Sequence, residues 1–221
     1  MNDDPPTDWP LIAPGIWLQA GDRPTEDGRP TLFLDRDGII IRDGGFVSEP
    51  ASVVLVPGAA GLIGAANRAG VPVAVVTNQS GIDRGLYGWA EFAAVQHEIE
   101  RLLAAEGARL DAVAACPFHP DHTPDYGPVH AAWRKPGPAM VAALGDRLRV
   151  DRTRSWLVGD RASDIEAARG AGLAGGVLLS LPGGPEMAAA RTLARSRFRV
   201  VVAADLESIM RTIPLPLDRT R

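Results

Sequence analysis

Several features of membrane, secreted and nucleic-acid-binding proteins are missing from this chain of 221 residues. No apolar run approaches the ~20 residues that cross a bilayer, and residues 1–10 lack the basic and apolar regions of a secretory signal. The single cysteine, Cys116, excludes an intrachain disulfide and indicates a reducing compartment. The net charge of −4 offers no basic excess for nucleic acid. We therefore expect a cytoplasmic protein without membrane or nucleic-acid partners.

The length fits one domain plus an extension, and no internal repeat or low-complexity tract divides it. Hydrophobic residues make up 46% of the chain and charged residues 23%, which predicts a sizeable buried core. Residues 1–29 are rich in Pro, Asp and Gly and predict an N-terminal extension packed on the edge of the domain. Residues 30–213 predict the domain itself, and residues 214–221 a C-terminal tail. We expect a monomer or a weak homo-oligomer.

From Thr31 onward, short apolar runs alternate with helical patterns. The runs predict buried strands over residues 31–34, 73–76, 112–115, 156–158, 177–179 and 199–203. Helices are predicted over residues 58–69, 89–105, 137–148, 163–169 and 186–195 and from residue 205, with a long loop over 117–133. This order predicts an α/β fold with a three-layer, Rossmann-like parallel sheet and helices on both faces. The Gly-x-Gly-x-x-Gly motif of dinucleotide-binding domains is absent after the first strand.

Two carboxylates follow the first predicted strand, in the sequence Asp35-Arg36-Asp37-Gly38. Ligand sites of open α/β sheets lie beyond the carboxyl ends of the strands, and two close carboxylates are costly unless a cation or a reaction uses them. Further polar groups follow other predicted strands: Thr77-Asn78, Lys135, and Asp160 with Asp164. A parallel sheet brings adjacent strand ends to one rim, so we expect these side chains to converge.

Each motif taken singly also has a structural interpretation. Asp and Gly are common turn residues, Thr77-Asn78 can cap a loop, and Lys135 can be a solvated lysine at a helix start. Ser163-x-x-Glu166 matches a capping box, which would begin a helix and place Asp164 in its first turn as a partner of Lys135 or of a metal. The joint pattern, in order and at strand ends, favours a functional site.

The residue types of this pattern fit phosphoryl transfer. Asp35 is expected to attack phosphorus and form an aspartyl-phosphate, while Asp37 protonates the leaving oxygen and then activates water. Asp35 and Asp160 are expected to hold one Mg²⁺ ion, which prefers oxygen ligands. Thr77 and Lys135 would hold the oxygens of the transferred phosphoryl group.

With these motifs the chain resembles the haloacid dehalogenase (HAD) superfamily of phosphatases. The resemblance spans about residues 31–173. Its matching segments are Asp35-Arg36-Asp37-Gly38, Thr77-Asn78-Gln79-Ser80-Gly81, Arg134-Lys135-Pro136 and Gly159-Asp160-Arg161-Ala162-Ser163-Asp164. Leu34 before the first segment and Ile82-x-Arg84-Gly85 after the second resemble the branch of heptose bisphosphate 7-phosphatases and histidinol phosphatases.

The resemblance implies the same roles for Asp35, Asp37, Thr77 and Lys135, and it adds the main-chain carbonyl of Asp37 to the Mg²⁺ ligands Asp35 and Asp160. Contacts with the rest of the substrate are implied for Asp43, Phe46, Asn78, Ser80, Arg134 and Arg161. Arginine can clamp a second phosphate through two hydrogen bonds, so the arginines of these segments favour a bisphosphate.

The spacing predicts a HAD-like domain with no large cap. Ordinary strand–helix connections use up segments 38–76 and 78–134, which leaves little room for a folded cap domain. We therefore expect an open site, with substrate selection by loops 43–50, 82–88 and 117–133.

The sequence departs from its relatives at two places. Ile39 follows the first motif, where relatives commonly have Thr. Many relatives also bind a structural zinc in the long loop, and the corresponding positions here are Cys116, Phe118, Ala131 and Trp133. With three of the four ligands missing, we expect no structural zinc. A Cys/His site of new spacing at His119, His122 and His130 stays open; the alternative is that Phe118 and Trp133 pin the loop by apolar packing.

The expected function is that of a Mg²⁺-dependent phosphomonoester hydrolase that works through an aspartyl-phosphate. Its expected partner is a small phosphorylated substrate, foremost a phosphorylated sugar such as D-glycero-D-manno-heptose 1,7-bisphosphate. Histidinol phosphate or another small phosphomonoester is the alternative substrate. A sugar-phosphate-binding module without turnover would lack a catalytic carboxylate or the lysine, and all of these residues are present.

Overall fold

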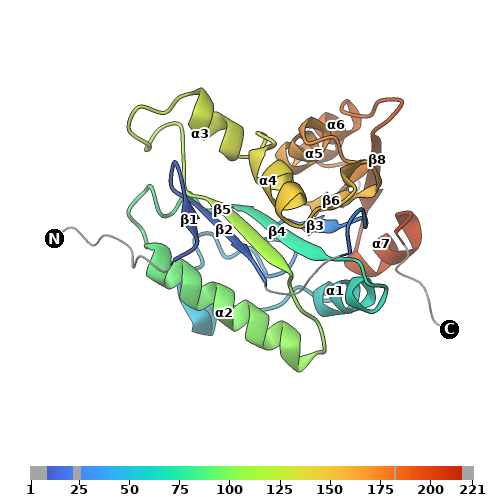
Figure 1. The fold of residues 1–221 in the computed structure, drawn as a ribbon, viewed down its shortest axis with the longest axis horizontal. Coiled ribbons are helices and arrows are strands. Elements are labelled where there is room, and N and C mark those ends of the chain that lie inside the picture. The colour runs from blue at the N-terminus through green and yellow to red at the C-terminus, as the bar shows by residue number, and fades with distance from the viewer. Residues whose placement is uncertain (1–8, 22–25, 182, 216–221) are drawn as a thin grey trace.

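The computed structural model describes residues 9–21, 26–181 and 183–215 (Figure 1). The strands are β1 (Leu11–Ile12), β2 (Ile16–Ala20), β3 (Leu32–Leu34), β4 (Val73–Asn78), β5 (Ala112–Cys116), β6 (Trp156–Gly159), β7 (Gly175–Leu179) and β8 (Arg199–Ala203). The helices are α1 (Ala59–Arg68), α2 (Trp89–Ala105), α3 (Pro128–Trp133), α4 (Ala139–Arg147), α5 (Ala162–Gly170), α6 (Pro185–Arg191) and α7 (Leu206–Thr212). Single 3₁₀ turns lie at Pro50–Ser52 and Arg152–Arg154.

All the described strands form one sheet in the order β1-β2-β5-β4-β3-β6-β7-β8. The strands from β3 to β8 pair in parallel, as the alternating pattern predicts. The sheet is nevertheless mixed, because β2 pairs antiparallel with β5 and β1 pairs antiparallel with β2.

Residues 11–20 therefore belong to the same sheet as the chain beyond residue 30, and the domain boundary near residue 30 stays a prediction. Residues 1–8 and 22–25 of the predicted extension, and residues 216–221 of the predicted tail, lie outside the described residues. Leu215, also assigned to the tail, is buried in the core.

The sheet is covered on both faces, which confirms the predicted three-layer α/β fold (Figure 1). Leu32 and Leu34 of β3 pack on the side of α1, α2 and α7, together with Phe92. Phe33, between them, packs on the opposite side with Met140 of α4 and Ile165 of α5. Alternate residues of one strand thus enter two apolar cores, which explains why the strands are continuous apolar runs.

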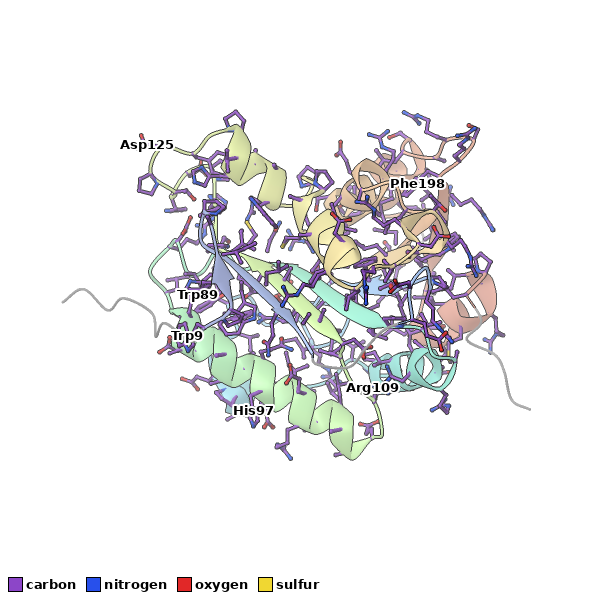
Figure 2. The ribbon with its side chains drawn as sticks, in the orientation of Figure 1. Trp9, Trp89, His97, Arg109, Asp125 and Phe198 are labelled. Atoms are coloured by element: carbon purple, nitrogen blue, oxygen red, sulfur yellow. The ribbon has the colours of Figure 1, made fainter. Side chains whose placement is uncertain are left out.

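An aromatic cluster joins β2 to α2. The ring of Trp17 on β2 lies 6.0 Å from that of Trp9, 5.7 Å from that of Trp89 and 5.2 Å from that of Phe92, measured between centroids. Figure 2 shows Trp9 and Trp89 at the N-terminal end of α2. This contact fastens the antiparallel edge to the rest of the domain.

Two predicted elements differ from the structure. The long loop over 117–133 contains α3, which begins at Pro128, a residue suited to the first turn of a helix. Helix α5 begins at Ala162, so the predicted capping box at Ser163-x-x-Glu166 is wrong. Instead, the carboxylate of Asp164 accepts a hydrogen bond from the main-chain N–H of Arg161 at 3.0 Å.

The strand order changes direction between β3 and β6, so their carboxyl ends form a topological switch point. From β3 the chain runs through β4 and β5 on one side, and β6 then pairs with the other side of β3. The segments between β3, β4 and β5 contain α1, α2 and connecting loops, and no large cap is present among the described residues. None of the described helices is long and apolar enough to span a bilayer.

Candidate active site

A cavity of about 580 Å³ lies at the carboxyl ends of the central strands. Every site residue predicted from the sequence lines it: Asp35, Asp37, Asp43, Phe46, Thr77, Asn78, Ser80, Arg134, Lys135, Asp160, Arg161 and Asp164. These residues come from the end of β4 and from the segments that follow β3, β4, β5 and β6, so the parallel sheet brings distant parts of the chain together. Their individual roles stay predictions.

Lys135, the only lysine of the chain, lies buried at the base of this cavity. Its Nζ lies 2.8 Å from Oδ1 of Asp35 and 2.7 Å from Oδ1 of Asp164, and donates to the carbonyl oxygen of Val76 at 2.9 Å. These contacts match the three hydrogens of an ammonium group. Burial lowers the pKa of Lys135, but the Asp164 and Asp35 carboxylates outweigh it and raise the pKa overall. The side chain is therefore a fixed positive charge.

Three carboxylates gather around this ammonium. Oxygens of Asp35, Asp160 and Asp164 lie within 4.8 Å of one another. Both oxygens of Asp164 are engaged, one with Lys135 and one with the main chain of Arg161. Asp160 differs, since its Oδ1 is buried and has no hydrogen-bond partner in the described part of the chain.

The cluster has a charge imbalance that a divalent cation would correct. Three carboxylates share one ammonium, which leaves about two negative charges in a buried place. Burial, and then the charges of Asp35 and Asp164, raise the pKa of Asp160 to about 6. Burial also raises the pKa of Asp35. Asp35 and Asp160 therefore offer the oxygens that could hold a hard metal ion.

Asp37 is held from two sides. The Nη2 atom of Arg36 donates to both carboxylate oxygens, at 3.0 and 3.1 Å, and Gln79 Nε2 donates to Oδ2 at 2.9 Å. Arg36 is itself buried and lies over the ring of Phe92, with Cζ 5.7 Å from the centroid. Burial raises the pKa of Asp37. A carboxyl group with a raised pKa in a cleft suits proton transfer.

Two side chains of this network were not assigned a role from the sequence. Gln79 also donates to Thr77 Oγ1 at 2.7 Å, and it accepts a hydrogen bond from the Tyr87 hydroxyl at 2.6 Å. Burial raises the pKa of Tyr87 to about 12, so the hydroxyl remains a donor. Gln79 lies inside the motif Thr77-Asn78-Gln79-Ser80-Gly81, and this position is the only feature of the sequence that indicates a role for it.

Asn78 lines the cavity but is engaged with the main chain of Lys135. Its Nδ2 donates to the Lys135 carbonyl at 3.1 Å, and its Oδ1 accepts from the Lys135 N–H at 3.0 Å. This pair of bonds ties the end of β4 to the lysine. The side chain therefore supports the position of Lys135 directly.

The outer part of the cavity is cationic. Arg84 Nη2 lies 2.9 Å from Nε2 of His119, and its guanidinium lies over the exposed ring of Phe46. Arg134 donates to a main-chain carbonyl at 2.9 Å. Arg161 lies 3.9 Å from the Asp43 carboxylate, an exposed and weak ion pair. Burial, and then the charges of Arg134 and Arg84, lower the pKa of His119, a residue considered from the sequence only as a ligand of an alternative Cys/His site.

The loop over 117–133 is packed by aromatic rings. Phe118 is buried with its ring 4.5 Å from that of His130, and the ring of Tyr126 stacks on that of His130 at 5.8 Å. Trp133 packs against the same core. Burial raises the pKa of Cys116 to about 12, which disfavours the thiolate that zinc requires. The absence of a structural zinc stays a prediction.

Comparison with known proteins identifies the family. A family model described as HAD-hydrolase-like matches residues 132–201. A D-glycero-beta-D-manno-heptose-1,7-bisphosphate 7-phosphatase of Mesorhizobium japonicum is 45% identical over 185 residues, covering 81% of this chain and 83% of the relative. This chain belongs to the haloacid dehalogenase superfamily of phosphatases. As a HAD phosphatase it is a phosphoric monoester hydrolase of the heptose bisphosphate phosphatase branch.

Other relatives of this HAD phosphatase carry related names. The protein of Rhodopseudomonas palustris with the same beta-heptose name is 42% identical over 147 residues, covering 66% of this chain and 82% of the relative. A D-glycero-alpha-D-manno-heptose-1,7-bisphosphate 7-phosphatase of Burkholderia mallei is 43% identical over 142 residues, covering 64% and 75%.

Solved structures of two HAD phosphatases share the fold. A HAD-like phosphatase of Mesorhizobium loti has a TM-score of 0.71 and 42% identity, covering 85% of this chain and 98% of that one. The D,D-heptose 1,7-bisphosphate phosphatase of B. bronchiseptica, complexed with magnesium and phosphate, has a TM-score of 0.68 and 33% identity, covering 82% and 99%.

Proposed function

We propose that this HAD phosphatase hydrolyses a phosphorylated sugar through an aspartyl-phosphate on Asp35, with Mg²⁺ as its cofactor. The observation that carries the proposal is the position of the Asp35 carboxylate. It follows the central strand β3, faces the cavity, and lies 2.8 Å from the Lys135 ammonium and close to Asp160. A carboxylate placed in this way can attack phosphorus while neighbouring charges hold the phosphoryl oxygens.

The site fits the metal. The carboxylates of Asp35 and Asp160 and the main-chain carbonyl of Asp37 would hold Mg²⁺, and the buried, unpartnered Oδ1 of Asp160 supports this assignment. When bound, the ion supplies positive charge that offsets the phosphate dianion. The magnesium and phosphate in the B. bronchiseptica relative also support it.

The remaining roles follow from the contacts of each side chain. Lys135, whose three N–H bonds already have partners, holds a phosphoryl oxygen through the attraction of its fixed positive charge. The Thr77 hydroxyl accepts from Gln79, so its own hydrogen is available for a phosphoryl oxygen. Asp37 gives its proton to the leaving sugar oxygen as the Asp35–phosphorus bond forms. It then takes a proton from the water that releases phosphate.

A sugar bisphosphate is the substrate class that best fits the outer cavity. Arg84, Arg134 and Arg161 all line it and can bind a second phosphate, which arginine recognises through paired hydrogen bonds. The names of the relatives, which include the beta and the alpha form, support heptose 1,7-bisphosphates as the first candidates.

Replacement of the nucleophile tests the reaction. Asp35→Asn removes the attacking charge with little change of shape, so turnover should fall by roughly 1,000-fold or more while the fold is kept. The measurement is phosphate release from the two heptose 1,7-bisphosphate anomers, fructose 1,6-bisphosphate and histidinol phosphate, with circular dichroism as the fold control. Near-wild-type turnover by Asp35→Asn would overturn the mechanism, and a preference for histidinol phosphate would overturn the substrate class.

A further inference from the structure

Gln79 and Tyr87 form a chain of hydrogen bonds that ends on Asp37. The Tyr87 hydroxyl donates to Gln79 Oε1 at 2.6 Å, and Gln79 Nε2 donates to Asp37 Oδ2 at 2.9 Å. Gln79 is buried, and the same Nε2 reaches Thr77 Oγ1 at 2.7 Å. All the polar atoms of the amide therefore have partners, which is the usual condition of a buried amide.

We propose that Gln79 and Tyr87 are positioning residues that fix the Asp37 carboxyl for proton donation to the leaving group. The inference rests on the proposed function, in which Asp37 is the proton donor. An amide can turn over so that its oxygen and nitrogen exchange places. The Tyr87 hydroxyl donates to the amide oxygen, and the Asp37 carboxylate, which as an anion can only accept, takes the amide N–H. Gln79 thus presents its N–H to Asp37.

The local packing allows the contact between Tyr87 and Gln79. Tyr87 follows a turn and comes back over Gly81, where a Cβ atom would lie 2.1 Å from Cε1 of the Tyr87 ring. Only glycine leaves room for the ring at that place. Gly81, the last residue of the motif, thus allows Tyr87 to reach Gln79, the third residue of the same motif. On the other side of the carboxylate, buried Arg36 completes the support of Asp37.

The test compares two leaving groups. Release of an alkoxide from a heptose 1,7-bisphosphate needs a proton, whereas p-nitrophenolate leaves without one. We measure kcat/KM for both substrates, because this constant contains only the steps up to the first phosphoryl transfer. Tyr87→Phe keeps the ring over Gly81 and removes the hydroxyl, so kcat/KM for the sugar should fall about tenfold, and Gln79→Leu should lower it about 100-fold. The value for p-nitrophenyl phosphate should stay within about threefold of wild type in Tyr87→Phe. Gln79→Leu also loses the bond to Thr77, so it should lower this value too, but by less than the value for the sugar.

Matched controls separate positioning from general damage. Tyr126→Phe changes the other tyrosine of the chain, and Gln96→Leu changes another buried glutamine; neither residue lines the cavity. Both should leave the ratio of the two kcat/KM values unchanged. Thermal unfolding of every variant reports whether it is folded at the assay temperature. Tyr87→Phe retains its packing and so provides the decisive comparison if Gln79→Leu is unstable.

Asp37→Asn distinguishes the inference from the function on which it rests. It should lower kcat/KM for the sugar far more than for p-nitrophenyl phosphate. One outcome is that Asp37→Asn gives this difference while Tyr87→Phe and Gln79→Leu lower kcat/KM for both substrates equally, or for neither. The positioning role is then overturned, and Asp37 keeps its role. If Asp37→Asn itself affects both substrates equally, the proton-donor role fails and the inference fails with it.

Discussion

At the scale of single residues, the dominant feature of the site is unbalanced buried charge. Asp35 and Asp164 each contact the Lys135 ammonium, whereas Asp160 has a buried oxygen without a partner in the described residues. Without a metal, ionisation of Asp160 is therefore a cost to the folded state. Its pKa is raised from 3.8 to about 6 by burial and by its neighbours. This shift links the stability of the metal-free protein to pH.

The direction of this link can be tested with Asp160→Asn. An unfolded chain ionises Asp160 near pH 3.8 and the folded chain near pH 6, so its contribution destabilises the fold as pH rises through this window. In the presence of a chelator, Asp160→Asn should unfold at a higher denaturant concentration than wild type at pH 8. The difference between the two unfolding midpoints should shrink as the pH is lowered to 4. An advantage that is larger at pH 4 than at pH 8 would contradict the assignment.

Magnesium should reverse the order of stability of the two proteins, so that the wild type becomes more stable than Asp160→Asn. A ligand that binds only the folded state stabilises it by mass action, so Mg²⁺ at pH 8 should raise the unfolding midpoint of the wild type. Asp160→Asn, which lacks one of the proposed ligands, should gain much less. Calcium-free and magnesium-free buffers with a chelator give the reference for both proteins.

At the scale of elements, the site depends on how closely α3 approaches the segment after Lys135. A Cβ atom at Gly137 would lie 2.2 Å from the carbonyl oxygen of Ala131 and 2.3 Å from that of Ala132. Main-chain atoms cannot move aside as a flexible side chain does. The end of α3 and the lysine segment are thus packed backbone against backbone.

Gly137→Ala should therefore push α3 away and displace Lys135. Forcing an extra methyl group into a packed site costs about 1–3 kcal/mol, and phosphatase activity should fall together with stability. The control is Gly61→Ala in α1, where nothing lies within 4 Å of the added carbon and stability should rise slightly, by about 0.4–1 kcal/mol. Equal unfolding midpoints for the two variants would argue against the close contact. The measurement is urea denaturation alongside phosphate release.

The elements also explain which features a sequence alone could predict. Strands such as β4 contain a continuous apolar run rich in β-branched residues, and α2 has a regular apolar spacing, so both could be predicted. Helix α3 could not, because its loop is rich in Pro and His and its stability comes from Phe118 and other tertiary contacts. The pairing of β2 with β5 joins residues nearly 100 positions apart, which no local pattern reveals.

The same division applies to the site. Asp35 and Asp160 follow strands, Thr77 lies at the end of one and Lys135 ends the segment after another, all in short motifs. Their convergence on one cavity could therefore be predicted from the topology of a parallel sheet. The contact between Tyr87 and Gln79 could not, because it depends on the path of a turn over Gly81.

At the scale of the whole molecule, one sheet carries both the core and the chemistry. The central strands are buried on both faces, and their carboxyl ends deliver the charged residues to one cavity. The antiparallel strands β1 and β2 extend this sheet beyond β5, and the Trp17 cluster holds them against α2. The loops at the cavity can therefore vary while the framework that holds Asp35 and Lys135 stays the same.

Because the chain has one lysine, the amine of Lys135 can be labelled selectively. Apart from the terminal amino group, Lys135 is the only target for acylating or reductive-methylation reagents, and in the folded protein it is enclosed and protonated. Peptide mass spectrometry should find it unmodified in native protein and fully modified in denaturant. Rapid modification of native protein would contradict the ion pairs described for this residue. If native protein is labelled only slowly, the extent of labelling at Lys135 is a covalent record of how often the cavity opens.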